Sequence, residues 1–335
     1  MVDQRQGSIL RAVVEHYVAT SQPVSSSQVT HDTRISASPA TVRSEMATLE
    51  RDGYLQQPHT SAGRIPTDRG YRFFVDQLTS PGTLAPAQSQ DVRSFFNAAT
   101  GEIEKMLHET GRLLSGLTGA AAVVVGPDHD TTRVRSVQLV TLGPHTALAV
   151  LVFSDGGIEK RSIPLDDGTD EATVTAAAAR LDAHLDGKAL SYTEPVLSSG
   201  EARVDVLVDR TLHALQTGHH DESDNVFVGG ASRLASSFDA VEKVRNALTI
   251  LEQQYVVVSL ISDLLDRGMS VSIGAENNLE SLADCSLVVA PTFIEGEQRG
   301  SVAILGPTRM DYGQAMAAVT IVSRRLGERL SEAAR

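Results

Sequence analysis

Hydrophobic residues recur at helical intervals through the first fifty positions and predict three helices there. The first covers residues 7–20, and Ser25 is a suitable N-cap for a short second helix. Ser38 is a similar cap for the third helix, and the following Pro39 fits its first helical position. This third helix should bury one stripe of residues spaced i, i+4, i+7, namely Val42, Met46 and Leu49.

The outward face of the third helix is a candidate binding surface. It carries small side chains, hydroxyl groups and arginine, which suit a helix that approaches the edges of DNA bases closely. Ser38 and Arg51 are expected to contact the DNA backbone. We expect four further residues near the bases or the adjacent phosphates: Thr41, Arg43, Ser44 and Thr48.

A short hairpin is predicted directly after this helix, which Gly53 ends. Residues 54–57 and 64–66 have strand character and flank a turn-rich tip, and another helix begins after Thr67. Helix, strand, loop and strand in this order are typical of a winged helix-turn-helix. The wing is expected to contact DNA through His59, Thr60, Ser61 and Arg64. The alternative is a protein-interaction module, in which the outward helix face is an ordinary solvated surface.

The pattern changes after residue 78. Residues 79–90 are rich in Pro, Ser, Thr and Gly and indicate a linker, and a long amphipathic helix is expected from residue 90 to about 117. Four strand-like runs then suggest an antiparallel meander: 121–125, 134–142, 146–153 and 158–164.

Helices follow and then strands return, which suggests a domain inserted within another domain. Residues 166–186 and 201–217 have helical patterns, as does the segment 238–267, which predicts two helices. The Leu and Val faces of the inserted helices are a plausible dimer interface. Three strands and a last helix close the chain: 269–273, 286–293, 300–305 and the segment from Tyr312 onward.

Composition is that of a soluble globular protein of two or three domains. Hydrophobic residues make up 41% of the 335 positions and charged residues 21%. The single cysteine, Cys285, excludes an intramolecular disulfide. The sequence has no apolar run of membrane-spanning length and no signal-peptide pattern, so we expect a cytoplasmic protein with no membrane partner.

The net charge of −13 is unusual for a DNA-binding protein, but it is unevenly distributed. Residues 1–78 contain eight arginines, no lysine and eight acidic residues, so their net charge is zero and the whole −13 lies beyond them. A neutral module binds DNA weakly through charge alone. We therefore expect two modules per complex and modest non-specific affinity.

Two further motifs are candidate sites of another kind. The segment 306–313, GPTRMDYG, contains Thr308, Arg309 and Asp311 but lacks the lysine of a phosphate-binding loop. We favour a capped turn from strand to helix, with Arg309 paired to an acidic neighbour; the alternative is an anion or effector site at the helix start. Glu276 and Asn277 have the same two interpretations: a structural turn, or part of an effector pocket.

Catalytic and metal sites are not expected. Neighbouring histidines at adjacent positions do not converge well on one ion, which argues against a metal site in the cluster His213, His219, His220, Asp221 and Glu222. No spacing of nucleophile and base, or of paired carboxylates, is apparent. We expect no enzyme activity, no metal and no cofactor.

Four blocks together resemble a known family. They are residues 38–78, the segment 226–234 (VFVGGASRL), the segment 273–277 (IGAEN) and the segment 306–313. In this order, the blocks resemble those of the heat-inducible transcription repressors of the HrcA type. The resemblance covers most of the chain, except roughly residues 165–225.

The resemblance implies an α+β protein with an N-terminal winged helix-turn-helix and a GAF-like α+β domain interrupted by a dimerisation domain. It also implies a homodimer on an inverted-repeat operator in double-stranded DNA, upstream of bacterial chaperone genes, whose activity depends on chaperonin. The expected boundaries are 1–78 for DNA binding, 79–90 for the linker, 91–165 with 226–335 for the GAF-like domain, and 166–225 for the insertion.

Two rival hypotheses remain open. One is a ligand-sensing transcription regulator whose GAF-like domain binds a small molecule. The other is a protein-binding scaffold with no role at DNA.

Overall fold

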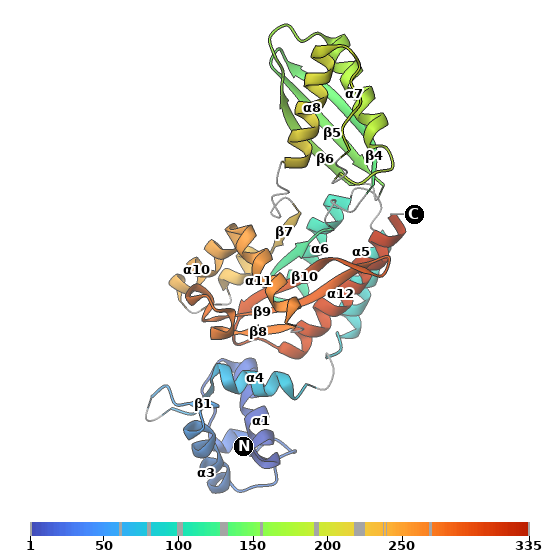
Figure 1. Cartoon of the computed structure of the whole chain (residues 1–335). Helices are drawn as coiled ribbons and strands as arrows, with labels where there is room; N and C mark the ends of the chain where they lie inside the picture. Colours follow the sequence, from blue (N-terminus) through green and yellow to red (C-terminus); the bar gives the residue numbers. More distant parts are fainter. Residues whose placement is uncertain are drawn as a thin grey trace.

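The chain forms three units that follow one another along the long axis of the molecule (Figure 1). The computed structural model describes residues 2–59, 62–78, 82–98, 103–127, 133–154, 157–190, 194–217, 225–236, 238, 240–267 and 270–333. We call the three units the N-terminal unit, the central unit and the inserted unit. The central unit lies between the other two.

The N-terminal unit contains helices and one small hairpin. Strand β1 pairs antiparallel with β2, with Leu55 opposite Pro66. Caps predicted from the sequence are confirmed, because the side chain of Ser38 accepts from the Thr41 N–H and that of Thr67 from the Gly70 N–H. The elements are α1 (Gln4–Thr20), α2 (Ser26–Val29), α3 (Pro39–Arg51), β1 (Leu55–Gln56), β2 (Ile65–Pro66) and α4 (Asp68–Asp76).

Helix α3 buries the stripe that its sequence predicts. Val42, Met46 and Leu49 are fully buried in the core of the N-terminal unit. Gly53 follows the helix with a φ of +80°, a conformation that glycine adopts without strain, and the chain then turns into β1.

The central unit is built on a five-stranded antiparallel sheet with helices on both faces. The strand order is β7-β3-β10-β9-β8. Alternate residues of β3 point to opposite sides: Ala122 and Val124 join the core under α6 and α12, whereas Ala121 and Val123 join the core under α9 to α11. The strands are β3 (Ala121–Val125), β7 (Val226–Gly229), β8 (Val271–Ile273), β9 (Cys285–Ile294) and β10 (Glu297–Pro307).

The helices of the central unit divide between the two faces of the sheet. On one face lie α5 (Pro86–Ala98), α6 (Ile103–Thr118) and α12 (Tyr312–Ala333). On the other lie α9 (Ala231–Ser236), α10 (Val241–Glu252) and α11 (Gln254–Asp266). Two short 3₁₀ helices, η2 (Gly274–Asn277) and η3 (Glu280–Leu282), connect β8 to β9.

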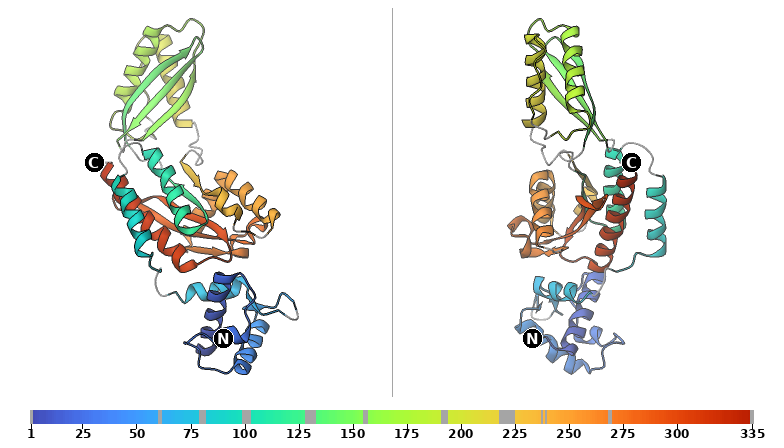
Figure 2. Two further views of the ribbon diagram at one scale, coloured as in Figure 1. Left: turned by 180° about the vertical axis from the view of Figure 1, so that it is seen from behind. Right: turned by 45° about the vertical axis from the view of Figure 1, so that its right-hand side comes forward.

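The inserted unit combines three strands with two helices. The strands β4 (Val134–Gly143), β5 (Thr146–Phe153) and β6 (Ile158–Pro164) form an antiparallel meander. One face of this sheet is covered by α7 (Glu171–Leu185) and α8 (Ala202–Thr217), and strands and helices share one hydrophobic core (Figure 2).

This packing corrects the expected edges of the insertion. The boundary expected at residue 166 falls inside the inserted unit, because β4 to β6 pack on α7 and α8 and not on the central sheet. Of the four strand-like runs, only β3 belongs to the central sheet, where it pairs with β10 and β7. The apolar faces of the inserted helices were also misassigned to dimerisation, since Val204, Leu207 and Val208 of α8 are buried within the chain.

A second correction concerns the helix expected from residue 90 to 117. The structure has two separate helices, α5 and α6, and each of them packs against α12 (Figure 2). The sequence between them contains Gly101, a residue of low helix propensity. Helix α5 starts at Pro86, so the last residues of the expected linker 79–90 are helical.

Among the described residues, no single helix is long and apolar enough to cross a membrane. The pair α10 and α11 passes such a test by length and composition together, but it is bent by 87°.

Candidate nucleic-acid interface

Helix α3 presents its polar face to solvent at the end of the molecule remote from the central sheet (Figure 1). Ser38, Arg43, Ser44 and Arg51 are exposed, and Thr41 is half-buried. Thr48 is also half-buried. The structure therefore places all six helix residues singled out from the sequence on or beside one surface.

The hydroxyl groups on this face also make bonds within the helix. Ser38 Oγ lies 2.9 Å from Thr41 Oγ1 and accepts from the Thr41 N–H at 3.2 Å. Thr48 Oγ1 donates to the Ser44 carbonyl at 3.3 Å. These bonds hold the side chains in place while leaving acceptor positions on their oxygens.

The arginines of the N-terminal unit fall into two groups, those bonded within the protein and those without a partner in the described structure. Six of its eight arginines have a hydrogen-bond or ion-pair partner in the protein: Arg5, Arg11, Arg34, Arg64, Arg69 and Arg72. In the part of the chain that the structure describes, Arg43 and Arg51 have none. Both lie on the exposed face of α3, where their guanidinium groups can meet an external partner.

The hairpin next to α3 is fixed to it by Arg64. Arg64 Nε donates to Glu50 Oε2 on α3 at 2.9 Å, and the side chain is 16% exposed. Its backbone N–H and carbonyl each bond to Val24 at 2.9 Å. Arg64 therefore holds the hairpin in place, and its guanidinium group is already bonded within the protein.

Of the remaining wing candidates, the structure describes only His59. His59 is exposed. Thr60 and Ser61 lie outside the described residues.

Four residues that support α3 were missed from the sequence: Arg34, Asp32, Glu15 and Arg69. Arg34 pairs with Asp32 and Glu15 and orders the connection before α3; its hydrogen bond lowers the pKa of Asp32 to about 2. Arg69 donates to the Asp52 carbonyl at 2.8 Å, just beyond the C-terminus of α3, and stacks on Tyr54. Asp32 and Arg34 are only two residues apart, a local signal that could have revealed their pairing.

The motif around Glu276 is a structural turn that also touches the N-terminal unit. Glu276 accepts from the Ile273 N–H at 2.9 Å and pairs with Arg72 of α4. Asn277 is 4% exposed, and its Nδ2 group faces three backbone carbonyls, those of Gly274, Leu282 and Cys285.

The segment 306–313 forms the capped turn that its sequence suggests. Asp311 Oδ1 accepts from the Gln314 N–H at 2.9 Å at the start of α12. The Thr308 carbonyl accepts from the Tyr312 hydroxyl at 2.6 Å. The expected acidic partner of Arg309 is not found among the described residues.

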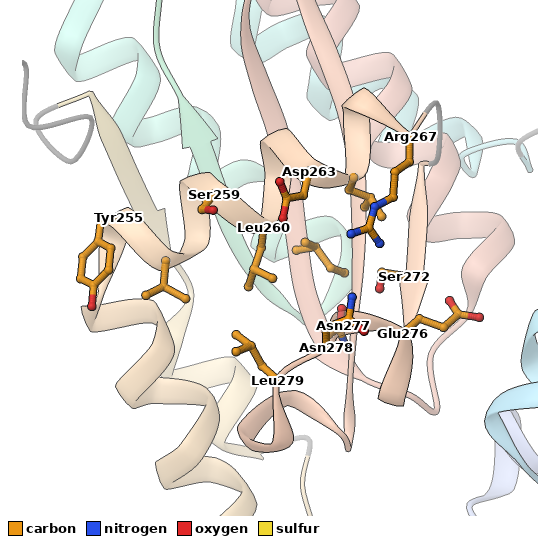
Figure 3. A pocket seen from close by; sticks show the side chains of 13 residues that line it. Tyr255, Ser259, Leu260, Asp263, Arg267, Ser272, Glu276, Asn277, Asn278 and Leu279 are labelled. Carbon is orange, nitrogen blue, oxygen red and sulfur yellow. The ribbon is translucent and has the colours of Figure 1, made fainter.

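A cavity of about 290 Å³ opens between α11 and η2. Asp263 and Arg267 of α11, with Ser272 of β8 and Asn277 of η2, form its polar side, and Leu260 and Leu279 its apolar side (Figure 3). Asn277 Oδ1 is buried without a hydrogen-bond partner in the described structure.

The described residues contain no cluster of three or more metal-binding side chains. His213 lies on α8. The other members of the histidine cluster, His219, His220, Asp221 and Glu222, lie outside the described residues.

Comparisons with known proteins identify relatives of this chain. The family model of the HrcA protein C terminal domain matches residues 104–316. The chain is 34% identical over 342 residues to a heat-inducible transcription repressor HrcA of Pelotomaculum thermopropionicum, covering all of this chain and 98% of that protein. It is 35% identical to the protein of the same name from Carboxydothermus hydrogenoformans, over 98% of each.

A crystal structure of a hypothetical protein shares the fold. Its TM-score is 0.69 at 23% identity, and the match covers 99% of this chain and all of that one.

These relatives define the class of the protein as a transcription repressor, a class that generally has no enzyme activity. The chain belongs to the HrcA family of heat-inducible transcription repressors, and the resemblance inferred from the four sequence blocks is confirmed.

Proposed function

We propose that the N-terminal unit is a winged helix-turn-helix and that α3 reads the sequence of double-stranded DNA. The observation that carries this proposal is the contrast among its arginines. Six are bonded within the protein, whereas Arg43 and Arg51 face solvent without a partner on one helix. Arginine on the exposed face of a helix suits bidentate contact to guanine or to phosphate.

Ser38, Thr41, Ser44 and Thr48 would complete this face beside the two arginines, with the backbone contacts assigned to Ser38 and Arg51. His59, Thr60 and Ser61 at the hairpin tip would contact a neighbouring groove or phosphate. Arg64 is less suited to such contact, because it already pairs with Glu50.

The central unit is proposed to be the GAF-like domain. An antiparallel sheet with helices on both faces supports this assignment. The inserted unit then interrupts it between β3 and β7, two strands that pair with each other.

We further propose a homodimer formed through the open face of the inserted sheet. The other face of this sheet is covered by α7 and α8. On the open face Val140 pairs with Leu148 and Val152 pairs with Ile158, and Val140 and Ile158 are exposed. Two copies could bury this apolar face against each other.

A dimer accounts for binding by a module without net charge. Two copies of α3 on an inverted repeat double the specific contacts, and the acidic remainder of each chain is repelled by DNA. The proposed target is the operator upstream of heat-shock and chaperone genes, with activity dependent on chaperonin, as the family resemblance implies.

Fluorescence anisotropy tests the proposal. The protein, with and without chaperonin, is titrated into an inverted-repeat duplex taken from upstream of chaperone genes and into a scrambled duplex of the same composition. We expect tighter binding to the inverted repeat. Equal affinity for both duplexes would contradict the proposal that the protein is a sequence-specific repressor.

The cavity beside Asn277 favours one alternative, a regulator controlled by a small molecule. Operator binding that appears only after addition of a small-molecule fraction from cells would support this alternative over the chaperonin-dependent repressor.

A further inference from the structure

Helix α4 docks on the central unit through residues that come from separate parts of the sequence. Arg72 donates from Nε to Glu276 Oε1 at 2.8 Å and from Nη2 to the Val271 carbonyl at 2.8 Å. A second contact joins Arg72 Nη2 to Glu276 Oε2. Arg72 and Glu276 are 204 residues apart and form a paired, charge-assisted contact between the two units.

Other contacts surround this ion pair. Asp68 accepts from the Ala275 N–H at 3.1 Å, directly beside Glu276. Gly274 precedes Ala275 with a φ of +55°, and a side chain there would meet the Asp68 carboxylate. The strained backbone position and the close approach both favour glycine at residue 274.

An aromatic contact forms the buried part of the interface. The rings of Tyr71 on α4 and Tyr312 on α12 have centroids 5.8 Å apart, and both residues are almost fully buried. The Tyr312 hydroxyl is held by Ser286 Oγ at 2.8 Å and the Thr308 carbonyl. The segments 273–277 and 306–313, candidate sites with no assigned role in DNA binding, thus form the surface on which α4 rests.

This docking leaves the polar face of α3 uncovered. Helix α4 faces the central sheet, whereas α3 lies on the remote side of the N-terminal unit (Figure 1). The contact therefore does not block α3, and its effect is to fix the direction in which α3 points.

The covalent connection alone does not fix that direction. Helix α4 ends at Asp76 and α5 begins at Pro86, so a short segment joins the units. One backbone bond, from the Gly82 N–H to the Gly313 carbonyl at 3.1 Å, holds that segment to the turn before α12. The side-chain contacts of α4 with the central unit add to this connection in setting the direction of α3.

We propose that Arg72 and Glu276 are positioning residues that set the orientation of α3 on the body, and thereby the spacing of the two half-sites that a dimer can bind. This inference rests on the proposed function. The contact between Arg72 and Glu276 is already formed in the free protein. The entropic cost of fixing the orientation of the N-terminal unit is therefore not added to the free energy of DNA binding.

The test compares single half-sites with pairs of half-sites. Duplexes are first enriched from a random library by the full-length wild-type protein. The selected site is then rebuilt as one half-site and as two half-sites whose spacer is shortened or lengthened in single base-pair steps. Affinities are measured by fluorescence anisotropy for the wild type, Arg72→Ala and Glu276→Gln.

We expect wild-type affinity to peak sharply at one spacer length. In both variants the affinity for the paired site should fall by about tenfold and the peak should broaden, because the second half-site is then bound by a unit whose orientation is less firmly held. Affinity for the single half-site should stay unchanged. The double variant should lose no more than Arg72→Ala alone, because the contribution of Glu276 to the docking acts through its contact with Arg72.

Glu276→Gln keeps the acceptor for the Ile273 N–H and guards against a simple loss of folding. Arg325→Ala is the matched control, because Arg325 pairs only locally, with Glu328 at 2.8 Å on α12, in the described structure. An unchanged spacer profile in Arg72→Ala and Glu276→Gln would overturn the proposal, as would an equal loss on single and paired sites. If the wild type enriches no sequence at all, the proposed function itself fails.

Discussion

Arg43 is the residue whose removal most directly tests the proposed reading face. It is exposed and lacks a partner in the described structure, so its replacement disturbs no internal contact there. Arg43→Ala should weaken operator binding by about 1–3 kcal/mol if the side chain makes a bidentate base contact. A gel-shift titration against the operator measures the change.

Arg5→Ala provides the comparison within the same unit. Arg5 is exposed on α1 and pairs with Glu45 at 3.8 Å, so it is not part of the proposed face. Its removal should leave operator affinity unchanged. Equal affinity of Arg43→Ala and the wild type would take Arg43 out of the reading face.

The pairing of Asp32 with Arg34 predicts a pH dependence of stability. The hydrogen bond from Arg34 lowers the pKa of Asp32 to about 2, from an ordinary value of 3.8. A carboxylate with a depressed folded-state pKa stabilises the protein above its unfolded pKa and loses that contribution as the pH falls towards the folded value. The contribution should therefore be complete at neutral pH and disappear between roughly pH 4 and pH 2.

Thermal unfolding of the wild type and Asp32→Asn measures this contribution. The wild type should melt at a higher temperature than the variant at pH 7, and the difference should close as the pH falls below about 3. A difference that stays constant with pH would show that the charge of Asp32 does not stabilise the fold.

At the level of elements, the open face of the inserted sheet carries a prediction about assembly. Val150 lies on β5 between Leu148 and Val152 and points to the same face as both. Val150→Glu should place a charge in the proposed dimer contact and shift the protein towards monomer. Light scattering after size-exclusion chromatography measures the mass.

Arg203→Glu is a suitable control on the other side of the unit, because Arg203 lies on α8, where it donates to the Gly168 carbonyl, and not on the open face of the sheet. Its mass should equal that of the wild type. A Val150→Glu variant that remains dimeric would place the dimer contact elsewhere.

Local elements could be predicted from sequence because their signals are local. The cap Ser38 and the stripe Val42, Met46 and Leu49 lie within one helix, and their spacing alone determines which side is buried. The pair Arg72–Glu276 gave no such signal, since its members are 204 residues apart. The edge of the insertion was misplaced for the same reason: strand patterns show that β4 exists but not which core it joins.

At the scale of the whole molecule, the distribution of charge predicts weak salt dependence. In the described structure each N-terminal unit offers two unbonded arginines on α3, and the rest of the chain is acidic. With Arg43 at a base edge, a dimer that neutralises about two phosphates through its Arg51 side chains should give a slope of log K against log salt of roughly −2. Anisotropy titrations between about 50 and 200 mM KCl measure this slope.

A slope steeper than about −8 would mean that many more phosphates are contacted than these arginines explain. Adding a lysine to the exposed part of α3, as in Ala40→Lys, should steepen the slope by about 2 in the dimer.

The pairing of β3 with β10 has a consequence for synthesis on the ribosome. Val124 is opposite Val302, and the inserted unit and the helices α9, α10 and α11 lie between them in the chain. At about 5–20 residues per second, β3 leaves the ribosome roughly 10–35 s before its partner exists. During that interval the apolar run Ala121–Val125 of the nascent chain has no β10 to cover it. Vectorial synthesis therefore leaves this apolar strand without its partner every time the protein is made, before any contact with DNA.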